Sequence, residues 1–105
     1  MGCGSLGKDD PARILFTCSG CCAEGTAADK IGRLLRKAGY ARCGGSCLAG
    51  VSAGYPKFLN AAKAASAVVA IDGCGMRCAS VTLKKAQIAS TAYVLTERGF
   101  TPGQA

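Results

Sequence analysis

A short apolar run, followed by turn residues and two cysteines, constrains the fold of this chain more than any other stretch. Residues 67–71 (Ala-Val-Val-Ala-Ile) are all apolar, and an Asp-Gly dipeptide follows them. A run of this length, rich in β-branched residues, is typical of a strand buried on both faces, and Asp-Gly is typical of a turn. A helical pattern begins near residue 75. The sequence therefore predicts Cys74 at the carboxyl end of a strand and Cys78 in the first turn of a helix.

The spacing of these two cysteines indicates shared chemistry. Residues four apart lie on one face of a helix, so the sulfurs of Cys74 and Cys78 could reach the same ion. The partial positive charge of a helix N-terminus favours thiolates there. One cysteine alone would be interpreted as a small buried apolar residue. Because the chain contains eight, the pattern favours metal binding or thiol chemistry. Asp72 is expected to cap the turn that follows it, and hydrogen bonding to a metal ligand is the alternative role.

Length and composition predict one globular domain in the cytoplasm. The chain has 105 residues, half of them hydrophobic, which suffices for a single core. We expect residues 1–12, which are polar and rich in glycine, to form a flexible tail, and residues 13–105 to form a single α/β metal-binding domain. No apolar run approaches the roughly 20 residues of a membrane helix, and residues 1–10 lack the apolar centre of a signal peptide. In a reducing cytosol, clustered cysteines more often bind metal than form disulfides.

The net charge of +7 has two explanations. Nucleic-acid binding is one, but the basic residues at 30–37 and 84–85 fall on the polar faces of expected helices, and the few aromatic residues are not interleaved with them. The other explanation is a thiolate site, whose negative charge Arg42, Lys57 or Arg77 could offset. We therefore expect a metal ion as partner, with neither nucleic acid nor membrane. The sequence indicates no particular protein partner.

Strand and helix patterns alternate along the chain, which predicts a parallel sheet with right-handed crossovers. Thr26 is a candidate N-cap of the first helix and Gly39 its C-cap. The expected strands are residues 13–17, 40–48, 67–71 and 92–95, and the expected helices are residues 26–38, 56–65 and 75–87. The prediction is a three-layer α/β fold with helices on both faces of a four-stranded, mostly parallel sheet in the order 2-1-3-4.

In such sheets, ligands bind outside the carboxyl ends of the strands, where the strand order reverses. Three cysteines follow the first three expected strands, and a fourth lies one turn into the next helix: Cys18, Cys47, Cys74 and Cys78. Loops that are far apart in sequence are thus predicted to bring four sulfurs to one edge of the sheet. The chain contains no histidine. A zinc site would therefore use sulfur alone or add oxygen or water.

The same residues resemble a known family. Residues 17–20 (Thr-Cys-Ser-Gly), 47–50 (Cys-Leu-Ala-Gly) and 70–74 (Ala-Ile-Asp-Gly-Cys), together with Pro56 and Cys78, are similar to the DGC-domain family. This family is named for its Asp-Gly-Cys motif, and its members are described as zinc-binding. The similarity extends from about residue 14 to residue 95.

The resemblance implies a four-cysteine zinc site. Its ligands would be Cys18, Cys47, Cys74 and Cys78. This chain departs from the family pattern in having further cysteines, of which three are possible substitutes in the ligand set: Cys21, Cys22 and Cys43. Cys3 is a further departure. The extra cysteines also leave room for a second metal or a larger cluster.

Three functions use these cysteines. The first is a small zinc-binding protein whose metal is structural, sensed or carried. The second is an iron–sulfur protein with the same ligands. The third is a thiol-redox protein, because Cys18 and Cys21 form a C-x-x-C between a strand and a helix. A phosphatase is disfavoured, since its loop needs an arginine where Glu24 stands. The sequence favours zinc binding, with no catalytic residue assigned.

Overall fold

A computed structural model describes residues 13–18, 22–42 and 46–99, which form alternating strands and helices. In chain order the elements are β1 (Arg13–Thr17), α1 (Ala23–Lys37), α2 (Leu48–Ala53), α3 (Pro56–Ala64), β2 (Ala67–Asp72), α4 (Cys78–Lys85), β3 (Thr91–Val94) and the 3-10 helix η2 (Leu95–Arg98). The predicted tail, residues 1–12, lies outside the described residues.

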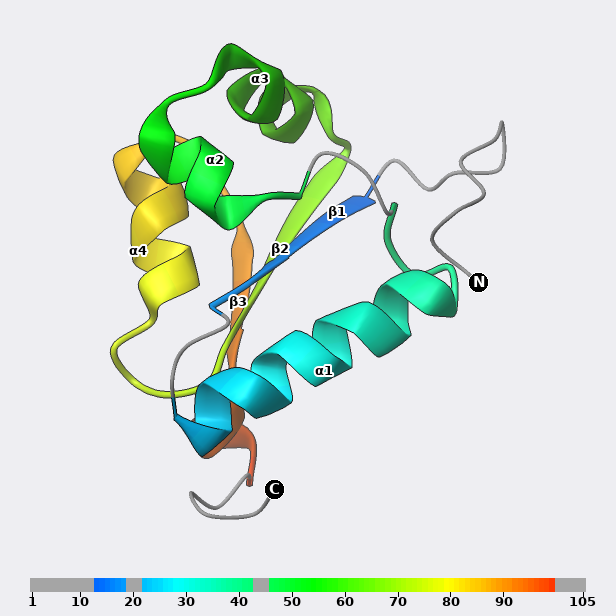
Figure 1. Cartoon of the computed structure of the whole chain (residues 1–105), viewed down its shortest axis with the longest axis vertical. Helices are drawn as coiled ribbons and strands as arrows, with labels where there is room; N and C mark the ends of the chain where they lie inside the picture. The colour runs from blue at the N-terminus through cyan, green and yellow to red at the C-terminus, as the bar shows by residue number, and fades with distance from the viewer. Residues whose placement is uncertain (1–12, 19–21, 43–45, 100–105) are drawn as a thin grey trace.

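The strands form a parallel sheet, as predicted. Their order is β1-β2-β3, with Thr17 of β1 opposite Ile71 of β2 and Ile71 opposite Tyr93 of β3. These are the first, third and fourth strands of the sequence prediction, in the predicted order. All three run the same way, so their carboxyl ends gather at the lower end of the molecule in Figure 1, where α1 and α4 begin.

The predicted second strand, residues 40–48, is wrong in the part of it that the structure describes. Residues 40–42 form a turn and coil, and Leu48 already belongs to α2. The described sheet therefore has three strands and not four, and the order 2-1-3-4 reduces to β1-β2-β3. The segment contains none of Val, Ile, Phe, Trp or Thr, and these are the residues that favour a strand, apart from Tyr.

Other groups contact the edge of β1 that this strand was expected to cover. The backbone amide of Arg42 donates to the Arg13 carbonyl at 3.0 Å, and Nη2 of Arg36 donates to the Leu15 carbonyl at 2.8 Å. Two donors thus satisfy alternate carbonyls of the edge strand without a neighbouring strand. Burial lowers the pKa of the Arg36 guanidinium, because removal from water disfavours the charged form.

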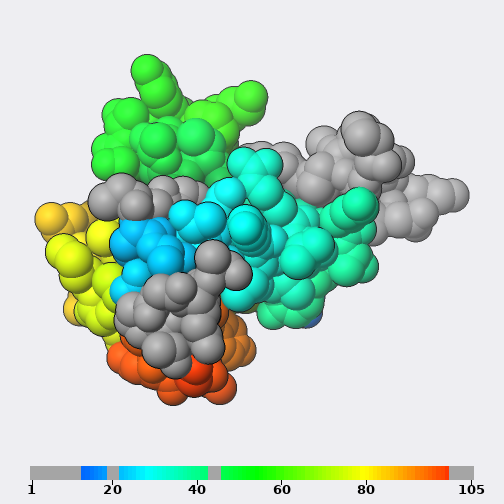
Figure 2. Space-filling model, turned by 60° about the horizontal axis from the view of Figure 1, so that its bottom comes forward, coloured from blue at the N-terminus to red at the C-terminus, as the bar shows by residue number. Residues whose placement is uncertain are grey.

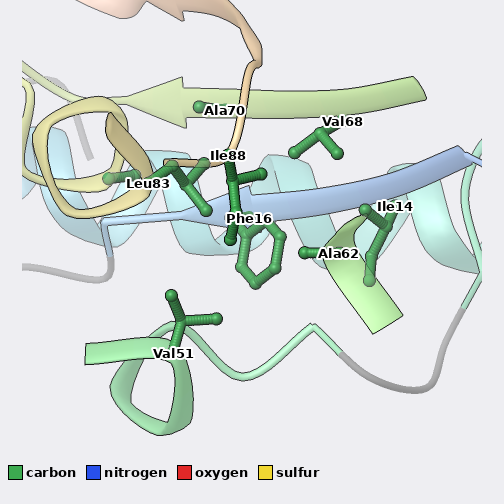
Figure 3. Close-up of a cluster of buried hydrophobic side chains, with 9 residues drawn as sticks. Ile14, Phe16, Val51, Ala62, Val68, Ala70, Leu83 and Ile88 are labelled. Carbon is green, nitrogen blue, oxygen red and sulfur yellow. The ribbon is translucent and has the colours of Figure 1, made fainter. Parts of the chain in front are cut away.

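Hydrophobic cores lie on both faces of the sheet, which gives the predicted layered arrangement. Alternate side chains of a strand point to opposite faces. On one face, Phe16 belongs to a cluster that packs against α2, α3 and α4. On the other face, Leu15 and Ile71 pack against α1. Figure 3 shows the Phe16 ring projecting from β1 towards Val51 of α2 and Ala62 of α3.

Helix α1 ends as predicted but begins earlier. Gly39 adopts a left-handed conformation, with φ of 89°, and its amide donates to the Arg36 carbonyl while the Tyr40 amide donates to that of Leu35. These two bonds form a Schellman motif. The prediction of Thr26 as N-cap is wrong, because the N-cap is Cys22. The Thr26 hydroxyl instead donates back to the Cys22 carbonyl at 3.2 Å, inside the first turn.

Across the described ranges, no helix combines the length and the apolar character needed to cross a bilayer.

Candidate functional site

The carboxyl ends of β1 and β2 meet at a cysteine and the Asp-Gly-Cys turn. The amide of Cys18, directly after β1, donates to the Ile71 carbonyl at 3.3 Å. The Cys18 sulfur in turn accepts a hydrogen bond from the Gly73 amide, with 3.3 Å between N and Sγ. Cys18 therefore contacts Gly73, the residue before Cys74, although the two strands that lead to them are far apart in the sequence. Both side chains are half-buried.

Gly73 occupies a position that only glycine fits. A β-carbon added there would lie 2.5 Å from the backbone carbonyl carbon and oxygen of Glu24, in the first turn of α1. The Gly73 carbonyl also accepts a hydrogen bond from the amide of Thr96 in η2, at 3.3 Å. Gly73 thus lies against α1, against η2 and against Cys18, the residue that directly follows β1. Figure 2 shows the end of the molecule where the starts of α1 and α4 and the helix η2 come together.

Asp72 is fully buried and caps helix α4. Its Oδ1 accepts from the Ala79 amide at 2.7 Å, and its Oδ2 accepts from the Ser80 amide at 3.1 Å and from the Ser80 hydroxyl at 2.6 Å. Asp72 has a capping role, as predicted, but it caps the start of α4 and not the turn that directly follows it. Hydrogen bonds to a charged carboxylate are stronger than those between neutral groups, so the end of β2 and the start of α4 are firmly joined.

The segment between Asp72 and α4 is a turn, and the helix begins later than predicted. Cys78 is the first residue of α4 and is exposed. Cys74 lies in the preceding turn, and its backbone carbonyl accepts a hydrogen bond from the Arg77 amide at 3.1 Å. Cys74 therefore lies outside the helix that Cys78 begins, so the two cysteines do not share a helical face. Arg77, the N-cap, has left-handed backbone angles (φ 53°, ψ 47°), and its Nη2 lies 3.2 Å from each carboxylate oxygen of Glu97.

The remaining described cysteines stand at the starts of helices. Cys47 is the exposed N-cap of α2, and its sulfur accepts from the Gly50 amide at 3.3 Å, so its predicted place at the end of a strand is wrong. Cys22 is the exposed N-cap of α1. The sequence analysis missed this placement. The available signal was a cysteine directly before each helical run, where Ser, Thr, Asp or Asn usually stands.

Comparison with known proteins decides the family. The family model of the DGC domain matches residues 14–105. The chain belongs to the DGC domain family. This DGC domain is also 30% identical, over 92 residues, to the anaerobic and virulence modulator AnvM of Pseudomonas aeruginosa strain PAO1. The aligned region covers 87% of this chain and 69% of AnvM. No solved structure matches the sequence of this DGC domain. The resemblance inferred from the motifs is confirmed.

The structure brings some of the predicted ligands together and not others. Two of them, Cys18 and Cys74, lie at one junction, Cys78 begins the adjoining helix, and Cys47 begins α2. Within residues 13–18, 22–42 and 46–99, no three side chains of His, Cys, Asp or Glu are grouped closely enough to hold a metal ion. The four-cysteine ligand set therefore stays a prediction. Of the other cysteines, Cys3, Cys21 and Cys43 lie outside the described residues.

The three basic residues predicted to offset the charge of a thiolate site lie in different parts of the molecule. Arg77 lies between Cys74 and Cys78, at the N-cap of α4, and its role as the offsetting charge of a thiolate site stays a prediction. Its ion pair with Glu97 is half-exposed. Arg42 is hydrogen-bonded beside Arg13, at the amino end of β1, so the prediction that it lies near the cysteines at the opposite end of this strand is wrong. Lys57 lies in α3, over the ring of Phe58.

Proposed function

We propose that this DGC domain is a metal-binding protein that holds one Zn²⁺ through cysteine thiolates at the carboxyl end of its sheet. The hydrogen bond from the Gly73 amide to the Cys18 sulfur is the observation that carries this proposal. It joins two strand ends that both lead into cysteines, and Cys78 follows at the start of the adjoining helix. With no histidine in the chain, thiolates supply the donor set, and thiolates select soft or borderline ions such as zinc.

Cys18, Cys74 and Cys78 would supply three ligands. The fourth would come from Cys47, which the family resemblance implies, or from one of the substitutes Cys21, Cys22 and Cys43. A zinc ion bound by four thiolates has no open position, so its role would be to crosslink loops or to be sensed or carried. Because the described residues do not group three ligands, we expect metal binding to be coupled to a rearrangement of these loops.

The relative AnvM supports a role in sensing over one in catalysis. Its name describes it as an anaerobic and virulence modulator. Thiolate metal sites respond to oxygen and to metal supply, because cysteine ligands oxidise and must be deprotonated to bind. A zinc-bound or iron–sulfur form of this chain would be suited to such a response in the cytoplasm.

Elemental analysis of the purified protein, prepared without added metal, tests the proposal. We expect one zinc per chain, and loss of zinc when Cys18, Cys74 or Cys78 is changed to Ser; Cys47→Ser shows whether the fourth ligand is the implied one. Cys3→Ser is the matched control, because Cys3 lies outside the residues that the family model matches. Unchanged zinc content in all four ligand variants would refute the site. Iron with acid-labile sulfide, in a brown protein, would identify the iron–sulfur alternative.

A further inference from the structure

We infer that Asp72 is a positioning residue for Cys74 and Cys78. Its carboxylate fixes where the loop that carries both cysteines begins and ends. For metal binding, the inference rests on the proposed zinc site. The placement of the two thiols relative to each other does not depend on the identity of the metal and can be tested separately.

A single buried side chain closes this loop. Asp72 ends β2, which hydrogen-bonds to β1 on one side and β3 on the other, so its backbone is held in the centre of the described sheet. Its two carboxylate oxygens bind the amides of Ala79 and Ser80, the second and third residues of α4. Residues 73–78 are therefore tied at both ends, and Cys78 adjoins the amide that is held at 2.7 Å.

The residue at the N-cap of α4 does not bind the first amides of the helix with its side chain. Arg77 stands at the N-cap of α4, but its side chain makes no capping hydrogen bond and binds Glu97 instead. A Ser or Asp at this position would satisfy the first amides of the helix without attaching them to the sheet. Asp72 satisfies the same amides from β2, so it sets the position of the helix start relative to the strand end. Asp72 thus caps α4 and also attaches the start of this helix to β2.

The Ser80 hydroxyl strengthens this attachment. It donates to Oδ2 of Asp72 at 2.6 Å, beside the bond from its own amide at 3.1 Å. An Asn at position 72 would keep one oxygen acceptor but place an amide NH₂ against an N–H donor of the helix. Asp72→Asn therefore preserves the size of the side chain and removes at least one of the three hydrogen bonds that the carboxylate accepts.

A dithiol probe measures the placement of the cysteines directly. Phenylarsine oxide binds two neighbouring thiols, forming two As–S bonds and releasing one water. In a variant of the 105-residue chain whose other six cysteines are Ser, only Cys74 and Cys78 remain for it to bridge. We expect Asp72→Asn to weaken this binding by about tenfold, and Ser80→Ala to weaken it less, because they remove one or more charge-assisted hydrogen bonds that hold the loop closed. Ser80→Thr, which keeps the hydroxyl, should bind the probe as the parent does.

A destabilised control separates positioning from general stability. Ile88 is buried just beyond the C-terminal end of α4, and Cys78 lies at the other end of this helix. Ile88→Ala should lower the thermal midpoint without altering the affinity for the probe. Equal affinity in Asp72→Asn and its parent, or an equal loss in Ile88→Ala, would overturn the inference. Zinc titration of Asp72→Asn in the otherwise native chain extends the test to the metal. If the native chain binds no zinc, the proposed function fails while the probe experiment still decides the role of Asp72.

Discussion

The guanidinium of Arg13 lies over the ring of Tyr40, 4.0 Å from its centre, and donates a 2.6 Å hydrogen bond to the Tyr40 carbonyl. Tyr40 follows Gly39, where the chain turns after α1. The pair therefore attaches the segment that leaves the helix to the first residue of β1. A backbone bond from Arg42 to Arg13 completes the attachment. Side-chain stacking here takes the place of the strand pairing that the sequence had indicated.

Arg13→Lys should destabilise the protein by about 1–2 kcal/mol, because lysine cannot stack as a plane and donate to the same carbonyl. Urea denaturation measures the loss. Arg98→Lys is the matched control, since the Arg98 guanidinium lies 5.0 Å from the centre of the exposed Tyr93 ring. We expect the control to change stability by less than about 0.5 kcal/mol. Equal losses in the two variants would contradict the role given to Tyr40.

Gly73→Ala should destabilise the protein by about 1–3 kcal/mol, because the new methyl group would collide with the backbone of α1 at Glu24, and backbone cannot move aside cheaply. Gly75→Ala, two residues later in the same loop, meets nothing within 4 Å and should be close to neutral. Thermal unfolding of both variants checks this difference. A Gly75→Ala loss as large as that of Gly73→Ala would show that the loop tolerates no side chain at all.

Gln87→Gly should stabilise the protein by about 0.5–1 kcal/mol. Gln87 has φ of 63° at the end of α4, where the Ile88 amide donates to the Leu83 carbonyl at 2.9 Å. Helices α1 and α2 end in the same type of turn with Gly39 and Gly54, which adopt such angles without strain. Gln87→Ala keeps the β-carbon and should bring no gain. If both variants were more stable than the parent, the gain in stability would come from loss of the Gln87 side chain and not from relief of the backbone angles.

Zinc should raise the thermal midpoint of the native chain, and a chelator should reverse the increase. Any ligand that binds the folded state at 100 times its dissociation constant stabilises it by about 2.7 kcal/mol. The increase should shrink as the pH falls, because protons compete with zinc for the thiolates. Cys74→Ser should abolish the increase and Cys3→Ser should preserve it. A response that survives Cys74→Ser would place the metal elsewhere on the chain.

The sequence was sufficient to predict the elements that an apolar pattern or a turn residue determines locally. The run at 67–71 is a buried strand because it is apolar throughout, and Pro56 and Gly39 begin and end helices through their own backbone preferences. The alternation of strands and helices predicts a strand at residues 40–48, although the strand propensity of this segment is weak. The structure follows the propensity in the part that it describes.

The details of the site depend on contacts between distant residues, which local patterns do not contain. The capping role of Asp72 could be predicted from turn chemistry, but its target amides at Ala79 and Ser80 could not, since the left-handed Arg77 displaces the start of the helix. The need for glycine at position 73 arises from α1 packing against it at Glu24. The sequence around Asp72 and Gly73 does not indicate which distant residues they contact.

The peptide groups on the two sides of Gly73 face different parts of the molecule, the amide towards the sulfur of Cys18 and the carbonyl towards the amide of Thr96. Alkylation or metallation of that sulfur alters the polarisation of the hydrogen bond it accepts, and the effect crosses one residue to reach η2. The nitrogen and proton resonances of Thr96 should therefore shift with the chemical state of Cys18. A two-dimensional NMR spectrum could follow the thiol in this way without any label on sulfur.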